Sequence, residues 1–403
     1  MKKVVINVIF ISLLYGSGWE YSFQGIRGLG MGNAYTALSE DASGVYFNPG
    51  GICFQKNLFE IQIGGTYYIP RYEMKWEIQN EDTIIERIKK SKFGIIFPQF
   101  FLSYKLNKFV LGLGYYVGYQ NKNEWEIKEY VWGEYIYQNF RSYLNITSFS
   151  PTLSYKANEK IGIGGKIEIL YVKYEINDKS EATQLREYGN GWSFTIGAGL
   201  LYKLSNIFSL GFNLKGPFKF KSKGKWYYYI PSLDTIFKYN IQSECNFPMA
   251  ISIGTGIKSI PNSLVAFEFE YTTWSFLDYF TAYAKTPEGK FKLYQYDFEF
   301  KNTFKIKTGF EYSLSTGLHI RTGFTYDKAA SPVSSLSLRN IDVDKFVFFW
   351  GIGYNIKNFT IDLAFSKGFG EEKEYGNTRY NMNPIVIGIS LILNRQEVKT
   401  DKK

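Results

Sequence analysis

The chain has 403 residues and a formal net charge of +10, and 19% of its residues are aromatic. Its mean hydropathy is −0.21, and beyond the first residues no segment is long and apolar enough for a transmembrane helix. A helical membrane protein is thereby excluded, whereas apolar residues that alternate with polar ones are typical of transmembrane β-barrels. A secreted β-sandwich or propeller is the alternative.

The N-terminus resembles a secretory signal peptide. The chain starts Met-Lys-Lys, residues 4–15 are apolar, and a Gly-Ser-Gly sequence precedes Trp19. The apolar run has 12 residues, whereas about 20 are needed to cross a bilayer as a helix. We therefore predict a signal peptide at 1–18 that is removed on export.

The next segment, residues 19–56, is rich in glycine. A phosphate-binding loop needs G-x-G-x-x-G between a strand and a helix, but these glycines follow a G-x-G-x-G pattern with no βαβ unit around them. We therefore expect sites where the backbone bends tightly or approaches another element, not a nucleotide site. The residues concerned are Gly28, Gly30, Gly32, Asn48, Pro49 and Gly50.

From residue 57 to 393, short turns alternate with longer polar stretches. Six turns rich in Asn or Gly lie at 107–108, 158–159, 205–206, 261–263, 315–317 and 357–358. Between them we expect seven long, irregular loops, at 74–92, 122–142, 177–190, 222–236, 275–291, 328–344 and 370–377. These thirteen connections join fourteen strands, and the even number places both termini on the side of the short turns, as in outer-membrane barrels. A kelch-type propeller would need four short strands in each repeat, but each repeat here holds two long ones.

Side-chain parity supports strands with one face in lipid. Within 359–369 five of the six odd positions are apolar and the even positions are small or polar, and a similar split recurs in 192–200 and 318–327. A sandwich also has an apolar face, so the signal peptide, the strand length and the aromatic content decide for the barrel. Because roughly eight strands already give a packed interior, a fourteen-stranded barrel needs something to close it. We therefore predict that residues 19–56 fold into the lumen as a plug.

Several stretches carry a family resemblance. "GLGMGNAYTALSEDASGVYFNPGGI" resembles the N-terminal hatch of the FadL/TodX family of outer-membrane transporters for long-chain fatty acids and aromatic hydrocarbons. "CNFPMAISIGTGI", "VAFEFEYTTWS", "FKIKTGFEYSLSTGLHIRTGFTYDKAASPV" and "FWGIGYNIKNFTIDLAFS" resemble strands of the same family. The resemblance implies a fourteen-stranded barrel, residues 57–393, that passes hydrophobic small molecules by passive uptake. The chain departs from the family at Asn48-Pro49-Gly50, where the family has Asn-Pro-Ala, in a short 177–190 loop, and in a charged tail at 394–403.

The third strand, 108–120, carries a candidate lateral gate. An apolar substrate gains nothing by entering the aqueous periplasm, so an exit through the wall into the bilayer is physically preferable. Such an exit needs a break in the strand ladder, which glycines or a bulge can produce, and the resemblance implies a kink in this strand. The alternative is that these glycines only make room for the plug. The glycines are Gly112, Gly114 and Gly118.

Charged residues share the lumen face of three consecutive strands by parity. They are Glu268, Glu270, Lys305, Lys307, Glu311, His319, Arg321 and Asp327. They form either a structural ladder of ion pairs or a site in which Arg321 leaves a positive group for the carboxylate of a ligand.

The predicted external loops are rich in large aromatic side chains. We predict that those of the second and fourth loops form an outer entrance for an apolar ligand, the alternative being an interfacial girdle. The residues are Trp125, Tyr130, Trp132, Tyr135, Tyr137, Trp226, Tyr227, Tyr228 and Tyr229.

Catalytic chemistry is not indicated. The single His and the two distant cysteines, Cys53 and Cys245, form no metal-binding or nucleophile pattern, and the sequence alone cannot assign a disulfide. We expect no enzyme activity, cofactor or metal. The expected partners are a hydrophobic small molecule and the lipid and lipopolysaccharide of a bacterial outer membrane, with no nucleic acid, and the chain is expected to act as a monomer. The alternative function is a shuttle or attachment component of a protein secretion system.

Overall fold

The computed structural model describes residues 19–80, 83–91, 93–131, 134–258, 260–337 and 341–396. The predicted signal peptide and residues 397–403 of the predicted tail lie outside this part. The tail prediction also began too early, because the last strand continues through Asn394 to Gln396.

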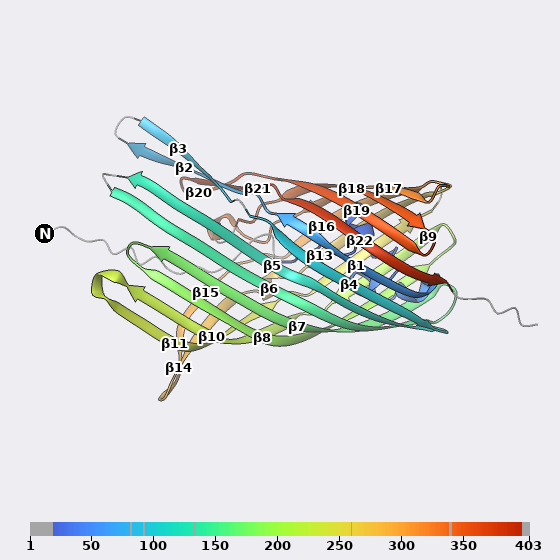
Figure 1. Ribbon diagram of the computed structural model, residues 1–403, viewed down its shortest axis with the longest axis horizontal. Coiled ribbons are helices and arrows are strands. Elements are labelled where there is room, and N and C mark those ends of the chain that lie inside the picture. Colours follow the sequence, from blue (N-terminus) through green and yellow to red (C-terminus); the bar gives the residue numbers. More distant parts are fainter. Residues whose placement is uncertain are drawn as a thin grey trace, which may run out of the picture.

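The fold is a closed antiparallel barrel of fourteen strands, which confirms the predicted class and strand number (Figure 1). The barrel closes where β1 pairs with β22, for example at Gly65 and Ile389. Four of the fourteen strands are interrupted and carry two labels each. In chain order the fourteen are β1 (Asn57–Ile69), β4 (Ile95–Leu106), β5 (Phe109–Val131), β6 (Glu134–Lys156), β7 (Ile161–Ser180), β8 (Gln184–Lys203), β9 and β10 (Phe208–Lys215 and Phe218–Ile230), β11 and β12 (Thr235–Phe247 and Ala250–Ile257), β13 and β14 (Ser263–Thr272 and Tyr279–Thr286), β15 and β16 (Gly289–Asp297 and Thr303–Ser313), β17 (Leu318–Asp327), β18 (Lys345–Ile356), β19 (Phe359–Gly370) and β22 (Ile385–Gln396).

All six predicted short turns connect neighbouring strands at one end of the barrel. Asn107 and Asn262 adopt the left-handed backbone (φ 55° and 60°) that made Asn a useful turn signal.

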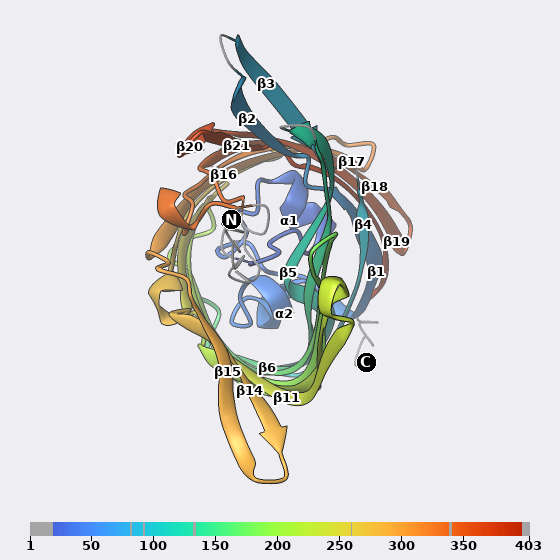
Figure 2. The same cartoon turned by 90° about the vertical axis from the view of Figure 1, so that its left-hand side faces the viewer.

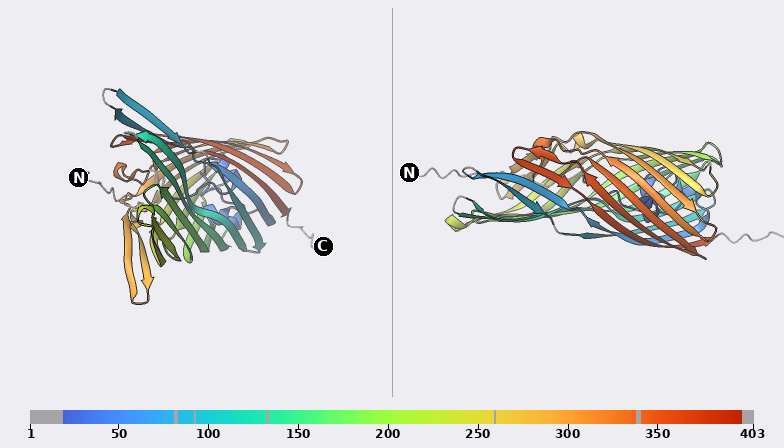
Figure 3. Two further views of the ribbon diagram at one scale, coloured as in Figure 1. Left: turned by 60° about the vertical axis from the view of Figure 1, so that its left-hand side comes forward. Right: turned by 90° about the horizontal axis from the view of Figure 1, so that it is seen from above.

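The prediction of seven irregular loops was largely wrong. Most of them are β-hairpins that extend the wall beyond the membrane, because the alternation of inward and outward side chains continues there with charged residues in place of apolar ones. A second sheet at this end contains β20 (Lys373–Tyr375), β21 (Thr378–Met382), β2 (Tyr72–Asn80) and β3 (Thr83–Lys90), and the β14–β15 hairpin stands away from the barrel (Figures 2 and 3). The short 3₁₀ helix η2 (Pro231–Leu233) lies at the tip of the β10–β11 hairpin, η3 (Trp274–Phe276) in the interruption between β13 and β14, and η4 (Val333–Ser335) in the connection from β17 to β18.

The outer face of the barrel is apolar, as the parity predicted. Trp192, Phe194 and Ile196 expose 68%, 72% and 66% of their surface, whereas Asp362 and Ser366 on an inner face are buried. Side chains of this kind are stable outside only where lipid covers them. Among the described residues, no helix is long and apolar enough to cross a membrane.

Residues 19–56 lie inside the ring of strands, where α1 (Ile26–Gly30), α2 (Gly44–Phe47) and η1 (Ile52–Phe54) are surrounded by the wall (Figure 2). Leu29, Val45 and Ile52 are fully buried. Glycine is needed here because the plug backbone approaches the wall backbone: a Cβ on Gly32, which has φ 64°, would lie 2.6 Å from Thr308 O.

Candidate functional site

The N-terminal segment of the described chain, residues 19–24, lies along the inside of β5 and forms an isolated antiparallel bridge with it at Glu20 and Tyr119. Tyr21 N donates to Gly118 O (2.9 Å), and Gln120 N donates to Trp19 O (2.8 Å). This segment therefore binds the part of the wall in which the lateral gate was predicted.

The wall itself is broken at this place. The pairing of β4 with β5 ends at Phe100 and Tyr115, although β4 continues toward Ile95 and stays paired there with β1. On its other side, β5 pairs with β6 across a register shift between Val117 and Tyr119. β4 and β5 thus separate beyond Tyr115, and Gly118 lies within the separated part of β5; Figure 2 also shows β5 inward of β1 and β4.

The three glycines of the predicted gate do not share one role. Gly112 and Gly114 lie within the intact ladder, and a Cβ on either would be 2.8 Å from a methyl group of Val45 in the plug. They therefore make room for the plug, as the alternative interpretation held. Only Gly118 lies at the break, where an added Cβ would have Tyr116 at 4.0 Å as its nearest neighbour.

Side chains of the N-terminal segment cover the break from inside. The Tyr21 ring packs on Phe97 with 4.1 Å between ring centroids, and its hydroxyl forms a hydrogen bond with Thr66 Oγ1 (2.7 Å). Gln24 Nε2 donates to Val117 O (2.7 Å), and Gly25 N donates to Gln99 Oε1 (2.5 Å). The contacts reach both strands, so this segment must move before anything can pass between them.

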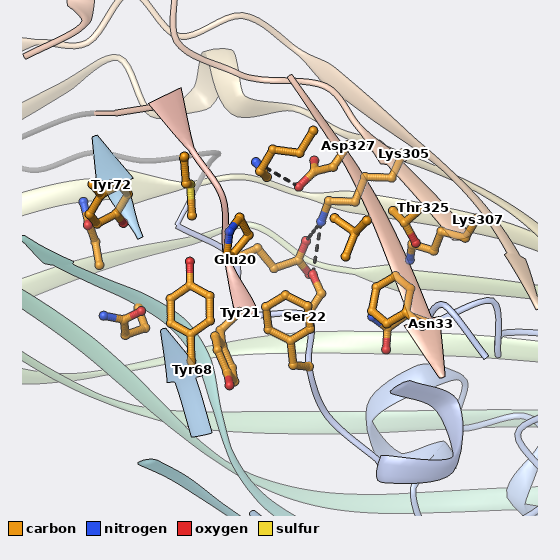
Figure 4. Close-up of a pocket in the computed structure, with 18 residues that line it drawn as sticks. Glu20, Tyr21, Ser22, Asn33, Tyr68, Tyr72, Lys305, Lys307, Thr325 and Asp327 are labelled. Carbon is orange, nitrogen blue, oxygen red and sulfur yellow. Dashed lines mark hydrogen bonds and ion pairs between the residues drawn. The ribbon is translucent and has the colours of Figure 1, made fainter. Parts of the chain in front are cut away.

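A cavity lies beside this segment in the lumen (Figure 4). Its empty volume is about 740 Å³, including the part open to solvent. One side is aromatic and apolar, with Tyr21, Phe23, Tyr68, Tyr72, Val347, Phe349 and Met382, and the other is charged, with Glu20, Lys305, Lys307, Asp327 and Lys345. Gln120 and Asn121 of β5 line it, and the adjoining residues Lys122 and Asn123 line a groove on the far side of the break with Tyr67, Ile95 and Ile96.

Trp19 occupies an aromatic cage next to this cavity. Its indole is 2% exposed and packs against Phe247 and Phe298, with centroid distances of 5.3 Å and 5.6 Å. Tyr119 of β5 packs on the same Phe247 (5.0 Å). The cage therefore links the N-terminal segment to the strand at the break.

The lumen charges form several groups of ion pairs, two of which also tie the plug to the wall. Glu20 of the plug pairs with Lys215 (2.7 Å) and Lys305 (2.6 Å). Arg27 of the plug pairs with Glu311 (2.7 Å), and Glu268 accepts hydrogen bonds from the plug backbone at Tyr35 and Thr36. Further pairs within the wall are Lys305 with Glu270, Lys307 with Glu268 and Glu270, and Lys345 with Asp327.

Arg321 does not present a free positive group to the lumen. Its Nε donates to Glu311 and its Nη1 to Asp362, each at 2.6 Å, and the side chain is buried. The geometry thus favours the structural interpretation of this residue over carboxylate recognition. His319, near a short turn, is within hydrogen-bond distance of Ser313 Oγ and Asn355 Nδ2, again in a structural setting.

The anchor at Glu20 depends on its charge. Burial raises the pKa of the Glu20 carboxyl, and the charge of Glu270 acts in the same direction, but Lys215 and Lys305 outweigh both and the net pKa is lowered. A carboxyl whose pKa is lowered in the folded state stabilises that state above its unfolded pKa, about 4.3, and loses this contribution as the pH falls further. The anchor is therefore complete at neutral pH.

A family model described as outer membrane protein transport protein (OMPP1/FadL/TodX) matches residues 15–388. The chain belongs to this family. It is accordingly an outer-membrane protein, as the sequence predicted.

Relatives of this FadL/TodX chain are distant in sequence but similar in fold. Outer membrane protein P1 of Haemophilus influenzae is 22% identical, over 94% of each chain. A FadL homologue from Pseudomonas aeruginosa is 16% identical with a TM-score of 0.75, covering 95% of this chain and 99% of that one. The toluene transporter TodX of Pseudomonas putida is 14% identical with a TM-score of 0.71 and the same coverage.

The aromatic residues predicted for the external loops are placed differently in this FadL/TodX barrel. Trp125 and Trp226 are 3% and 8% exposed and belong to the core, and Tyr228 is half-buried against Trp226. They lie on hairpin strands with their rings inward, so an exposed aromatic loop surface was wrong for these residues. Trp132 lies outside the described residues. Both cysteines, Cys53 and Cys245, are free and buried.

Sequence reasoning missed Trp19, Tyr21 and the β4 side of the break. One signal was present: Pro98 lies within β4, and proline is tolerated in sheets mainly at edges because it lacks an N–H. Next to the β5 strand, this end of β4 is an edge.

We predict that Arg321→Met destabilises the barrel by about 3 kcal/mol, because Asp362 loses a buried counter-ion and Glu311 keeps only Arg27. Urea unfolding in detergent measures this. The double variant Arg321→Met/Asp362→Leu should recover part of the loss. In either variant, uptake of a fatty acid and uptake of an uncharged hydrocarbon should change by the same factor. A selective loss of fatty acid uptake would instead support recognition of the ligand carboxylate by Arg321.

Proposed function

We propose that this chain takes up hydrophobic small molecules across the outer membrane without an energy source, by binding them in the lumen and releasing them sideways into the bilayer. The observation that carries the proposal is the break between β4 and β5, with the cavity on its inner side and a groove on its outer side. The family membership supports the transport role.

The substrate class follows from the site and from the relatives. The apolar side of the cavity, with Tyr68, Tyr72 and Phe349, suits a hydrocarbon chain or ring. Relatives are named long-chain fatty acid transport protein, in Escherichia coli, and toluene transporter, in Pseudomonas putida. Fatty acids and aromatic hydrocarbons are thus the proposed substrates. The cationic side chains at the cavity are already paired with carboxylates, so the hydrophobic part supplies the binding free energy.

The N-terminal segment acts as the gate in this mechanism. A ligand in the cavity competes with Tyr21 and Phe23 for the same aromatic surface on Tyr68 and Phe97. When Tyr21 leaves, the hydrogen bonds of the segment to β5 are lost with it, and the break opens toward the groove at Ile95 and Ile96. An apolar molecule then passes from the lumen into lipid without crossing bulk water.

We further propose that the chain has no enzyme activity and works as a single chain. The chain acts as a carrier path and transforms no substrate, since its buried charges are paired with one another or with the plug, as at Glu20, Arg27 and Arg321. We propose that it acts as a monomer, since the β1–β22 pairing completes the wall within one chain and no second chain is needed to close it.

The test is uptake by cells that lack other transporters of this class. Cells that express the chain should accumulate a labelled long-chain fatty acid or toluene faster than cells with an empty vector, and isolated outer-membrane vesicles should do so without an energy source. Equal accumulation of both substrates in the two strains would reject the transport proposal and favour the alternative, a shuttle or attachment component of a protein secretion system.

We predict that Tyr21→Ala raises the leak of small ions and substrate in the absence of ligand, because the ring on Phe97 and the hydroxyl on Thr66 are both lost. Tyr21→Phe is the matched control, since it keeps the ring and loses only one hydrogen bond. Planar-bilayer recording should show openings that are at least several times more frequent for the alanine variant. Identical traces for both variants would mean that Tyr21 does not hold the segment closed.

A further inference from the structure

A row of four lysines lies on the outer face of β10. Lys219, Lys221, Lys223 and Lys225 are exposed, and they alternate with the buried Phe218, Phe220 and Ser222 and with Gly224. At about 3.3 Å per residue, successive lysines on one face stand roughly 6.6 Å apart. This set of four residues is called the lysine row below.

The lysine row begins where the lipid-facing band ends. On β9, which leads into β10, the outward residues are apolar, with Phe212 exposed between Leu210 and Leu214. On the neighbouring β8, Ser193 Oγ donates to Lys219 O (2.8 Å), so the row begins beside Trp192 and Phe194, which are among the most exposed aromatic residues of the barrel. Because β9 starts at a short turn, the row lies at the end of the membrane band opposite to the periplasm, at the level of the outer leaflet headgroups.

The lysine row has few counter-charges of its own. Lys219 pairs with Glu244 (3.3 Å). Glu244 also stands opposite Lys221 in the ladder, but in the described part of the chain Lys221, Lys223 and Lys225 form no ion pair. The residues opposite Lys223 and Lys225 on both neighbouring strands are Asn190, Gln242, Tyr188 and Asn240. Further positive charge lies nearby, because Lys285 stands opposite Asn240 on the next strand and Lys238 opposite Tyr227.

Four like charges in one row repel one another, and an anion that spans them removes this repulsion. Lipid headgroups at this depth of an outer membrane carry phosphate groups, which are anions that fit this role. A lysine ammonium is a compact charge that suits phosphate, and its aliphatic part can lie along the apolar surface beside Trp192. A free phosphate would gain only the charge contacts, whereas a phosphorylated lipid also gains apolar contact with the exposed aromatic band.

We propose that the lysine row is a binding site for the phosphate groups of an outer-leaflet glycolipid, the lipid A part of lipopolysaccharide, whose acyl chains lie against Trp192 and Phe194. The site is independent of the transport path, since these side chains point away from the lumen. It makes a specific lipid a fixed partner of one side of the barrel wall.

The test compares two quadruple variants of the full-length protein, purified in detergent. The first replaces the lysine row by Gln. The control replaces Lys56, Lys108, Lys160 and Lys357, which are exposed at the opposite, short-turn end, and so removes the same net charge. Native mass spectrometry with added bisphosphorylated lipid A measures the bound fraction. Wild type and control should bind with similar affinity, and the row variant should bind at least tenfold more weakly.

Three further arms separate the sources of phosphate and the transport role. Lipid A without phosphates should bind the wild type as weakly as bisphosphorylated lipid A binds the row variant. Millimolar inorganic phosphate should compete only weakly with bisphosphorylated lipid A for the wild type. Equal binding by the row variant and the control, or full displacement by inorganic phosphate, would overturn the proposal. Substrate uptake by the row variant should match wild type, so a failure of the lipid site is distinguishable from a failure of transport.

Discussion

Removal of the plug should convert a closed barrel into an open pore. We expect a variant that lacks residues 20–54 to insert into outer membranes and to conduct ions continuously in planar bilayers, whereas the intact chain stays closed for most of the recording. The reason is geometric: a fourteen-stranded wall encloses more space than its own inward side chains can fill, and the described plug residues occupy that space.

The deletion also removes charges, and this determines what else to measure. Lys215 and Lys305 lose Glu20, and Glu311 loses Arg27. In a dry interior these losses would cost several kcal/mol, but in the opened lumen water reaches the groups and solvates them. The barrel should therefore still migrate as a folded species on an unheated gel, with a lower unfolding temperature than wild type.

The control is a deletion outside the plug, in the β14–β15 hairpin. Shortening the β14–β15 hairpin between Ala284 and Phe291 removes chain from a part that stands away from the barrel, and it should leave the bilayer silent (Figure 3). A silent bilayer for the plug deletion itself, with the folded band present, would show that the hairpins and loops at the outer end close the pore.

The strands of the barrel wall could be predicted from the sequence because the same local pattern recurs along the chain. The strands share a two-residue alternation, and each short turn contains an Asn or Gly; Asn107, Asn262 and Gly317 adopt the left-handed backbone, although at 357–358 Lys357 does so instead. Parity also placed Glu268, Lys305 and Arg321 on the correct face. What parity could not provide was the partner of each charge. Glu20 and Arg27 are far from the wall residues in the sequence, so their pairing arises only from the way the plug folds back.

For the predicted lateral gate, too, the sequence identified the residues but not their roles. Gly112, Gly114 and Gly118 look equivalent in the sequence, yet two of them face Val45 and one lies at the break. The difference depends on where β4 stops pairing, and this is set by tertiary contacts of the N-terminal segment with Gln99 and Val117. Local sequence carries no record of such contacts, although Pro98 marked the edge.

Cross-linking the break should abolish uptake while leaving the fold intact. We expect a variant with Ile96→Cys and Lys122→Cys, in a background in which Cys53 and Cys245 are replaced by Ala, to transport normally until a short bifunctional thiol reagent joins the two positions. Both residues line the groove outside the break, on β4 and β5 respectively, so the bridge closes the path without touching the plug. Uptake of labelled fatty acid should then fall to the level of cells without the protein.

The control places the same two thiols at Leu102 and Leu113, which are directly paired in the intact part of the same two strands. A bridge there adds a bond where the wall is already continuous, so uptake should persist.

Substitution of Gly112 or Gly114 is a weaker test, because the added side chain would press on Val45 and disturb the plug. If transport continues through the bridged break, substrates leave by another route, and the N-terminal segment would then gate a path along the lumen into the periplasm.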